Sequence, residues 1–344
     1  RDANGMNIRV INLAYGTNAD VDYRSDPLTH AVENAWHHGI VVVVAGGNEG
    51  RSERRLANPA LDPYVIAVGA AGHDASAANG WRVPSWSTTG DDTRNLDLVA
   101  PGEAIVSLGV AGSYLADTHP DATCIGDDGQ LRLRGSGTSQ GTAVVAGAVA
   151  MLLEQRPELT PDQVKHLLTS TATTLLDDRG EPRPSSQQGH GMLNLAAALE
   201  APTPGAESVQ THEPAVGGGS LETARGSFHV GDEGDQLTGE TTAFGGDFDS
   251  TAHALAETMG ATWSGATWSG ATWSGGTWSG ATWSGATWSG ATWSGATWSG
   301  ATWSGATWSG ATWSGATWSG ATWSGATWSG ATWSGATWSG NAWA

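Results

Sequence analysis

The residues of this chain best suited to chemistry are Gly137-Thr138-Ser139, which lead directly into a run of small residues from Gly141 to Leu153. A glycine turn can expose a serine hydroxyl, and the start of a helix offers free backbone N–H groups and a positive dipole end to a developing anion. The small side chains predict a buried helix that packs closely against its neighbours. The pattern therefore indicates that Ser139 is a nucleophile.

A second segment supplies a partner for this serine. The apolar run 40–44 ends in a glycine turn that carries Asn48. An asparagine just past the end of a buried strand can aim its amide into a cleft, where acyl transfer needs a donor for the oxyanion of the tetrahedral intermediate. Such a residue in a turn more often satisfies its own backbone. The serine downstream favours the oxyanion role for Asn48.

The elements that must position these residues alternate between strands and helices. Strands are predicted at 9–13, 40–44, 65–68 and 97–100, and helices at 26–38, 141–153, 160–170 and 195–199. Thr160-Pro161-Asp162-Gln163 has the cap residue, first-turn proline and glutamine of a helix start. The order predicts an α/β fold with a mainly parallel sheet and helices on both faces, which carries its site at the carboxyl ends of the strands.

Composition excludes several classes of protein. The net charge of −19 leaves nothing to neutralise phosphates, so we expect no nucleic-acid partner. The single cysteine, Cys124, excludes an internal disulfide. No apolar run approaches the length of a transmembrane segment. The chain starts at Arg1 instead of a methionine, and we interpret it as a fragment whose N-terminal part lies outside the sequence.

Composition also divides the chain into three parts. Residues 1–202 have the composition of a globular domain. Residues 203–260 are acidic, rich in Gly and Thr and poor in apolar residues, which predicts a disordered linker. Residues 261–344 hold 16 copies of Ala-Thr-Trp-Ser-Gly, one of them with Gly276 in place of alanine, followed by a degenerate copy, and carry no charged side chain.

The repeat tail allows two interpretations. The 17 tryptophans of an uncharged segment must pack on one another or on a partner. One alternative is a β-rich solenoid or stacked-strand module, similar to pentapeptide-repeat solenoids in which four repeats make one square coil. The other is a flexible, adhesive low-complexity segment. Either predicts attachment to cell wall, polysaccharide or another protein.

The first domain resembles the subtilisin-like serine peptidases, or subtilases, over roughly residues 8–199. Several short blocks carry this resemblance in the family's order. They are Val10-Ile11-Asn12-Leu13-Ala14-Tyr15-Gly16, Ala45-Gly46-Gly47-Asn48-Glu49-Gly50, Asn58-Pro59-Ala60 with Val65-Ile66-Ala67-Val68-Gly69-Ala70, Leu98-Val99-Ala100-Pro101-Gly102, and Gly137-Thr138-Ser139 through Val145-Ala146-Gly147. After Ser139 the family often has methionine, and Gln140 stands here, which leaves the chemistry untouched.

The resemblance implies roles for individual residues. Ser139 is the expected nucleophile, and Asn48 with the backbone N–H of Ser139 forms the expected oxyanion hole. The expected substrate-binding residues, which would pair with the substrate as an added strand, are Ala14, Tyr15, Gly16, Ala45, Gly46 and Gly47. Ala57 is expected near the floor of the specificity pocket. A secreted endopeptidase that acts on polypeptides is the implied function, with an extracellular or cell-surface location.

The family also needs an aspartate and a histidine upstream of the serine. No segment of this chain resembles their surroundings, so we expect them upstream of the fragment and expect the chain as given to be nearly inert. The alternative is a non-catalytic surface-attachment protein with an inactive subtilase-like scaffold and a binding tail.

No cofactor is required by the implied reaction. Calcium is an expected structural ion, because calcium sites are common in the family, but the sequence does not locate one. Asp127-Asp128 near Asp121 forms an acidic loop. Acidic loops are usually just solvated, and the spacing matches no specific ligand set, so no metal-binding residue is predicted.

Overall fold

The computed structural model describes residues 7–259 except 78, 92, 230, 233, 234 and 243–245, and the short strands of the repeat tail. The chain forms two compact units. One comprises Arg9–Ala215 with Ala224–Ser227 and is called the sheet unit here. The other comprises Arg1–Ile8, Val216–Thr223 and Phe228–Ala344.

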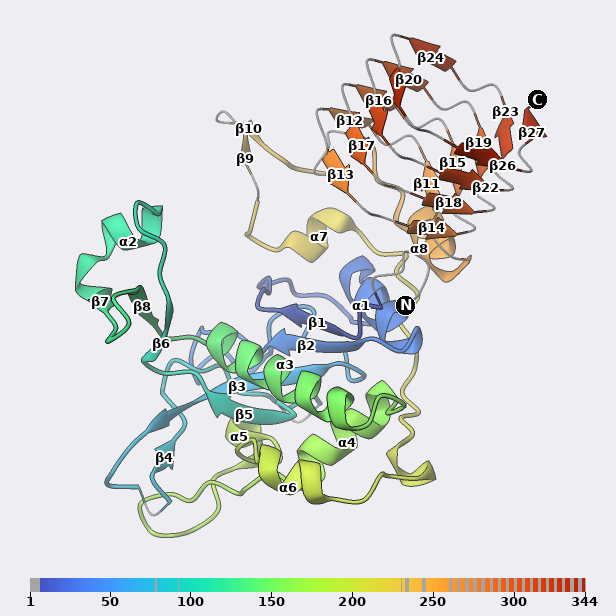
Figure 1. The fold of residues 1–344 in the computed structure, drawn as a ribbon. Coiled ribbons are helices and arrows are strands. Elements are labelled where there is room, and N and C mark those ends of the chain that lie inside the picture. The colour runs from blue at the N-terminus through green and yellow to red at the C-terminus, as the bar shows by residue number, and fades with distance from the viewer. Residues whose placement is uncertain are drawn as a thin grey trace. The chain divides into compact units, whose positions relative to one another are not determined.

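The sheet unit is built on a mainly parallel sheet, as the sequence predicts (Figure 1). Strands β1 (Val10–Leu13), β2 (Val41–Ala45), β3 (Ile66–His73) and β5 (Leu98–Pro101) are parallel neighbours in that order. The short β4 (Trp81–Arg82) pairs antiparallel with the end of β3. Val41 to Val44 are all fully buried, so both faces of β2 are covered.

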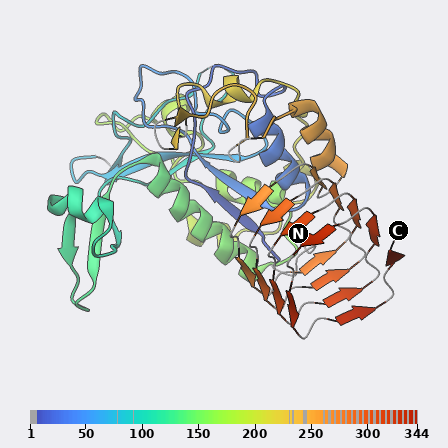
Figure 2. The ribbon, with the colours of Figure 1, turned by 90° about the horizontal axis from the view of Figure 1, so that it is seen from above.

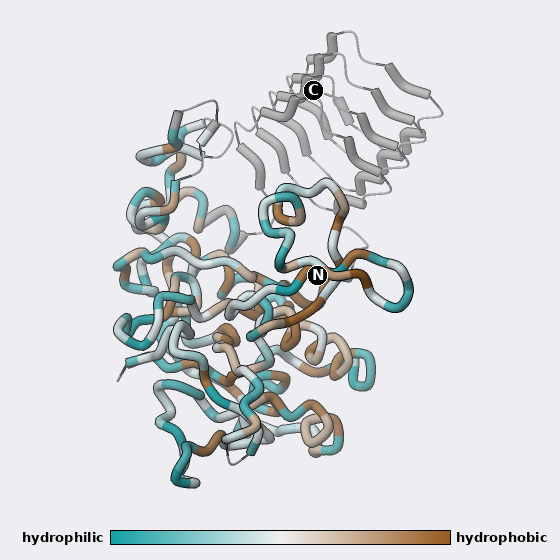
Figure 3. Tube along the Cα trace, turned by 90° about the vertical axis from the view of Figure 1, so that its left-hand side faces the viewer, coloured by the Kyte–Doolittle hydropathy of each residue, from teal (hydrophilic) through white to brown (hydrophobic). Residues whose placement is uncertain are grey.

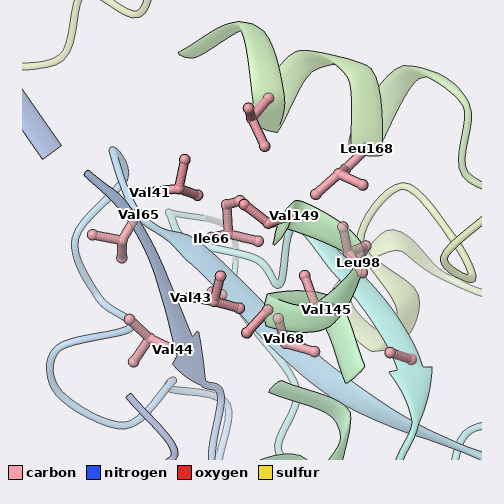
Figure 4. Packing of buried hydrophobic residues seen from close by; sticks show 14 of the residues in the cluster. Val41, Val43, Val44, Val65, Ile66, Val68, Leu98, Val145, Val149 and Leu168 are labelled. Atoms are coloured by element: carbon pink, nitrogen blue, oxygen red, sulfur yellow. The ribbon is translucent and has the colours of Figure 1, made fainter. Parts of the chain in front are cut away.

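Helices α1 (Pro27–His37), α3 (Thr138–Gln155), α4 (Pro161–Ser170) and α6 (Leu195–Glu200) lie where the sequence predicts them. Asp26 caps α1 by accepting a hydrogen bond from Thr29 N, and Thr160 and Gln163 form the expected capping box of α4. Helix α3 contacts β1, β2, β3 and β5. Figure 4 shows Val145 and Val149 of this helix packed among Ile66, Val68 and Leu98.

The small-residue helix packs closely against the sheet, as predicted, but only one of its faces is buried. Val145, Val149 and Leu152 are fully buried, whereas Gly147 and Met151 are exposed. Helix α3 therefore packs one face on the sheet. Its other face is open among the described residues, and so is the edge of β1 that faces away from β2.

An arm of residues 105–135 has no counterpart in the elements that the sequence predicts. Strand β6 (Ile105–Leu108) pairs with β8 (Leu131–Gly135), which also pairs with β7 (Thr123–Ile125), all antiparallel. Helix α2 (Tyr114–Thr118) and the 3₁₀ turn η1 (Pro120–Ala122) connect β6 to β7. The arm projects from the sheet beside the start of α3 (Figures 1 and 2). Its strands are short and no residue in them is buried, so their sequences lack the alternation of apolar and polar residues that would predict a strand.

Two cations, the partly buried Arg94 and the buried Lys165, hold the segment that precedes β3. The Arg94 guanidinium donates to the carbonyl oxygens of Ala60, Asp62 and Val65 and to the Asp97 carboxylate. The Lys165 ammonium donates to the carbonyls of Pro63, Tyr64 and Val65 and lies 3.1 Å from Asp97 Oδ1. Main-chain carbonyls that would otherwise be buried without donors are therefore satisfied by side chains.

The segment after the predicted domain boundary differs from the expected disordered linker. Gln210 donates to Tyr64 O and to Asp162, and the N–H of Ala215 donates to Glu33 Oε2 at 2.8 Å. The 3₁₀ turn η2 (Ala206–Ser208) also lies in this segment, and α5 (Ser185–Gln188) precedes it. Composition suggested disorder here, but a few specific hydrogen bonds tie residues 206–215 to the sheet unit.

The second unit contains α7 (Leu221–Arg225), of which the last two residues belong to the sheet unit, the hairpin β9 (Gly231–Asp232) and β10 (Asp235–Gln236), and α8 (Ser250–Met259). The repeats form one three-residue strand each, from β11 (Thr262–Ser264) to β26 (Thr337–Ser339), followed by β27 (Ala342–Trp343). Each strand from β11 to β23 pairs in parallel with the fourth strand after it, which gives four sheets. This is the arrangement of the solenoid alternative.

Apolar stretches of the described residues are short and alternate with hydrophilic ones (Figure 3). Accordingly, none of the helices in this part of the chain has the length and hydropathy needed to cross a membrane.

Candidate active site

Ser139 is the second residue of α3, immediately after the extended Gly137 and the first helical residue, Thr138. Its hydroxyl is partly exposed and donates to the carbonyl oxygen of Ala14 at 3.3 Å. The residue therefore sits at the positive end of an 18-residue helix, near the carboxyl end of β1.

Asn48 lies three residues after the end of β2 and reaches the start of α3. Its Oδ1 accepts a hydrogen bond of 2.8 Å from the backbone N–H of Thr138. The acceptor end of the amide is thereby occupied, and the Nδ2 end remains a donor with no acceptor among the described residues. The side chain is exposed, as a donor to a ligand must be.

The backbone N–H of Ser139 is the second donor at this place. In the first turn of a helix the N–H groups have no partner within the helix. Asn48 satisfies the N–H of Thr138, and the next one along, on Ser139, has no acceptor in the part of the chain that the structure describes. Asn48 Nδ2 and the N–H of Ser139 are therefore two donors without an acceptor among the described residues, both at the start of the helix that carries Ser139.

Thr138 joins the start of α3 to the loop that carries Asn48, a contact that the sequence does not predict. Its side chain is fully buried, and its Oγ1 accepts a hydrogen bond of 3.2 Å from the N–H of Gly47. Thr138 thus holds Gly47 through its side chain and Asn48 through its main chain. Its position next to Ser139 is the only feature of the sequence that points to a role in the site, and the sequence does not show which loop Thr138 contacts.

The turn that carries Asn48 needs glycine at one position. Gly47 has φ +117°, and a Cβ there would lie 2.8 Å from Thr88 Oγ1. Thr88 also accepts from the N–H of Glu49 at 3.0 Å and donates to its carboxylate. The close approach of Thr88 fixes the loop on the side opposite Thr138.

The expected substrate-binding residues lie together. The N–H of Ala57 donates to Gly46 O at 3.0 Å, and a Cβ on Gly16 would lie 2.7 Å from that of Ala57. The carbonyl oxygen of Ala14 accepts a hydrogen bond from the Ser139 hydroxyl. The neighbouring Tyr15 is 49% exposed. Ala45, at the end of β2, is buried. Ala57 thus contacts both segments, of which Ala14-Tyr15-Gly16 is at least partly exposed and Ala45-Gly46-Gly47 is buried.

Among the described residues, no acidic or basic side chain is hydrogen-bonded to the Ser139 hydroxyl. The only hydrogen-bond partner of its hydroxyl there is the carbonyl of Ala14. His37 and His38, at the end of α1, are bonded to Glu33 and to Asn34 O. The turn residue His190 donates its N–H to Asp97 O.

The acidic loop that was considered for calcium is partly neutralised by an arginine. Asp128 accepts from the N–H of Gln130 and pairs with Arg132 at 2.5 Å. No group of three or more His, Cys, Asp or Glu suited to a metal occurs within the described residues. A structural calcium ion stays a prediction without a location.

At the carboxyl edge of the parallel sheet, the site thus combines a serine at the start of a helix with two donors, Asn48 Nδ2 and the N–H of Ser139, that have no acceptor among the described residues. Residues 1–191 match the model of the subtilase family, Peptidase_S8. The chain therefore belongs to the subtilase family.

Curated relatives agree with this assignment. Serine protease AprX of Bacillus subtilis is 38% identical over 149 residues, which cover 42% of this chain and 33% of that protein. Subtilisin DY of Bacillus licheniformis is 33% identical over 199 residues, which cover 57% of this chain and 58% of that protein. The chain thus spans from a third to somewhat over half of the length of these relatives.

Solved structures also resemble this chain over about half of its length. Fervidolysin from Fervidobacterium pennivorans, a keratinolytic enzyme related to subtilisin, is 29% identical, with a TM-score of 0.42, over 51% of this chain and 25% of that one. The patellamide maturation protease PatA is 27% identical, with a TM-score of 0.41, over 56% of this chain and 61% of that one.

Proposed function

We propose that the chain is the nucleophile-bearing part of a secreted serine endopeptidase. The observation that carries the proposal is the contact between Asn48 Oδ1 and Thr138 N, which leaves the amide N–H₂ of Asn48 and the N–H of Ser139 free beside the Ser139 hydroxyl. Membership in the subtilase family supports peptide bonds as the substrate class.

In this reaction Ser139 Oγ attacks the carbonyl carbon of the scissile peptide bond and gives its proton to a histidine. Asn48 Nδ2 and the N–H of Ser139 bind the oxyanion of the tetrahedral intermediate. The histidine returns the proton to the leaving amine, and water then hydrolyses the acyl-enzyme. The histidine and the aspartate that orients it are supplied by residues upstream of this chain.

The substrate would bind as an added strand between two segments of the chain. Ala14-Tyr15-Gly16, which is exposed or partly exposed next to Ser139, would offer the main-chain groups for this pairing. The main-chain groups of Gly46 and Gly47 are already bonded within the chain, so Ala45-Gly46-Gly47 would wall the pocket. Ala57 contacts both segments and would form part of the floor of the pocket for the substrate side chain.

The test is labelling of the full-length protein, with its upstream part, by a fluorophosphonate probe. We expect covalent modification at Ser139 and none in the Ser139→Ala variant. A folded full-length protein that is not labelled at Ser139 would contradict the proposal.

The same experiment decides on a second candidate function. The Ser139 hydroxyl is bonded to a main-chain carbonyl instead of a base among the described residues, which is the observation that favours an inactive scaffold. In that case the protein is a surface-attachment protein, and absence of labelling together with retained surface binding would support it.

For the tail we propose attachment outside the cell, to cell wall, polysaccharide or a protein. The support is its composition, because a long tryptophan-rich segment without charge needs a packing partner. Deletion of residues 261–344 is expected to release the protein from its binding surface and to leave peptidase activity unchanged.

A further inference from the structure

The exposed segment beside the nucleophile is followed by residues that contact a distant part of the chain. Ala14-Tyr15-Gly16 is exposed or partly exposed, whereas Thr17 is buried. The Thr17 hydroxyl donates a hydrogen bond of 2.7 Å to the carbonyl oxygen of Ala224, 207 residues further along the chain. Residues 224–227, called the clasp here, belong to the sheet unit, although the residues before and after them belong to the other unit.

Asn18 binds the clasp with both ends of its amide. Its Nδ2 donates to Ser227 Oγ at 2.9 Å. Its Oδ1 accepts from the backbone N–H of Ser227 at 2.9 Å and from the Ser227 hydroxyl at 3.1 Å. Together with the bond from Thr17, four hydrogen bonds therefore join the clasp to residues 17 and 18.

Gly226 shows how closely the clasp approaches these residues. It has φ +60°, a conformation that favours glycine, and a Cβ there would lie 2.8 Å from the backbone nitrogen of Ala19. Ala19 and Ala224 are both buried. A side chain at position 226 would therefore displace the clasp from residues 18 and 19.

The clasp also lies near Tyr15 of the exposed segment. Burial raises the pKa of the Tyr15 hydroxyl, and the charge of Arg225 lowers it in part. Arg225 is therefore close enough to Tyr15 to act on its ring. The clasp reaches back from Thr17 and Asn18 towards the residues beside Ser139.

The exposed segment is held at its two ends. Before it, Leu13 pairs with Val44 in the sheet. After it, the backbone of Thr17 exchanges hydrogen bonds of 2.8 and 2.9 Å with Asn58. Among the described residues, every hydrogen bond from the side chains of Thr17 and Asn18 goes to the clasp. A binding segment that is already held in place loses less freedom when its ligand binds.

We propose that the clasp is a positioning element for substrate binding, which holds Ala14-Tyr15-Gly16 in place for pairing with a polypeptide. The inference rests on the proposed function, in which this segment binds the substrate. The clasp lies outside residues 1–191, which match the subtilase model. A part of the chain beyond that domain therefore contributes to substrate affinity, and Asn18, Gly226 and Ser227 contribute without touching the substrate.

The test compares a peptide that has five residues on each side of the scissile bond with the methyl ester of a single N-acetylated amino acid. The ester is too short to pair with the exposed segment. In the full-length protein, Gly226→Val is expected to raise KM for the peptide about ten-fold, which corresponds to one or two hydrogen bonds of an added strand. The kcat for the peptide and the kinetics of the ester should be unchanged.

The matched control is Gly180→Val. Gly180 also has a positive φ, of +81°, but nothing lies within 4 Å of the position of its Cβ. The backbone strain is therefore similar, and KM for the peptide should stay at the wild-type value. Loss of folded protein would lower the rates of both substrates together without a change in KM. A Gly226→Val protein with a normal KM for the peptide overturns the proposal.

A second pair of variants tests the same contact without backbone strain. Asn18→Leu removes all three hydrogen bonds to Ser227 and should also raise KM for the peptide. Asn18→Asp keeps an acceptor for the N–H and the hydroxyl of Ser227, so KM should return close to the wild-type value. If Asn18→Leu changes the free energy of unfolding but leaves KM unchanged, the contact serves stability alone and the proposal is wrong.

Binding separates this inference from the proposed function. The full-length Ser139→Ala protein is titrated with the fluorescently labelled peptide and followed by anisotropy. Addition of Asn18→Leu should weaken the affinity about ten-fold, and addition of Asn18→Asp should not. If the wild-type protein cleaves neither substrate, the peptidase function fails, and this difference in affinity alone supports the role of the clasp. Equal affinities of the variants, or absence of peptide binding, overturn that role.

Discussion

The side-chain oxygen of Asn48 accepts a hydrogen bond of 2.8 Å from the backbone N–H of Thr138, 90 residues further along the chain. Only the oxygen of an amide can accept from an N–H, so this contact fixes which end of Asn48 points away from α3. The donor end is held in place before any substrate binds. Such preorganisation is the main source of electrostatic stabilisation in acyl transfer.

Replacement of Asn48 should therefore reduce the rate of the full-length protein with little effect on substrate binding. We expect Asn48→Leu to lower kcat about 10²–10³-fold, which is the range known for removal of this donor in a related subtilisin. Asn48→Asp keeps an acceptor for Thr138 N and loses the donor, so it should be equally impaired. Steady-state kinetics would measure both, and an Asn48→Asp enzyme of normal kcat would exclude Asn48 from the oxyanion hole.

Thr138 should affect catalysis only by holding the loop that carries Asn48 in place. Thr138→Val keeps the shape of the side chain but leaves the buried N–H of Gly47 without its acceptor, which should cost about 1–3 kcal/mol of unfolding free energy. Because Gly47 precedes Asn48, kcat should fall while KM changes little. Thr138→Ser retains the acceptor and should restore both quantities. Denaturant unfolding and kinetics measure them, and a fully active Thr138→Val enzyme would argue against this role.

The sequence predicted the scaffold of the site better than the contacts within it. Val41 to Val44 and the cap residues Asp26 and Thr160 carry local signals, namely an unbroken apolar run and side chains that cap helices. The link between Thr138 and Gly47 joins residues 91 positions apart and has no local signal.

Two further parts of the structure, the arm of residues 105–135 and the segment 206–215, could not be predicted from the sequence for related reasons. The strands of the arm are short, and Val106 and Leu108 are exposed, so their apolar side chains mark no core. The segment that ends at Ala215 has a composition typical of disorder. However, the backbone N–H of Ala215 donates a hydrogen bond to the buried carboxylate of Glu33 in α1. Composition reports average burial and cannot show a single hydrogen bond of this kind.

Asp97 should be essential for stability. It is buried between the partly buried Arg94 and the buried Lys165, and its loss leaves both cations without their carboxylate. We expect Asp97→Asn to lower the free energy of unfolding by about 3–5 kcal/mol. Asp128→Asn, which removes an exposed carboxylate paired with Arg132, is the matched control and should have a much smaller effect. Equal effects in urea unfolding would refute the importance of the buried cluster.

The same carboxylate should make stability depend on acid pH. Burial alone would raise the pKa of Asp97, but Arg94 and Lys165 lower it to about 2 from the ordinary value of 3.8. A carboxyl group with a lowered folded-state pKa contributes stability above its unfolded pKa, and this contribution is lost as the pH falls from about 5 towards 2. Unfolding free energies measured over this range should fall more steeply for the wild type than for Asp97→Asn. Parallel curves would show that another group is responsible.

In the tail, Thr262 pairs with Thr282 and Thr282 with Thr302, so partners lie twenty positions, or four repeats, apart. If the gene gains or loses one repeat at its 3′ end, the tail gains or loses one strand, which is a quarter of a four-repeat coil. The strand pairs formed by the preceding repeats keep their register. Four added copies extend each of the four sheets by one strand. Copy number can therefore drift between generations and alter only the reach of the tail, while the sheet unit and its serine are unaffected.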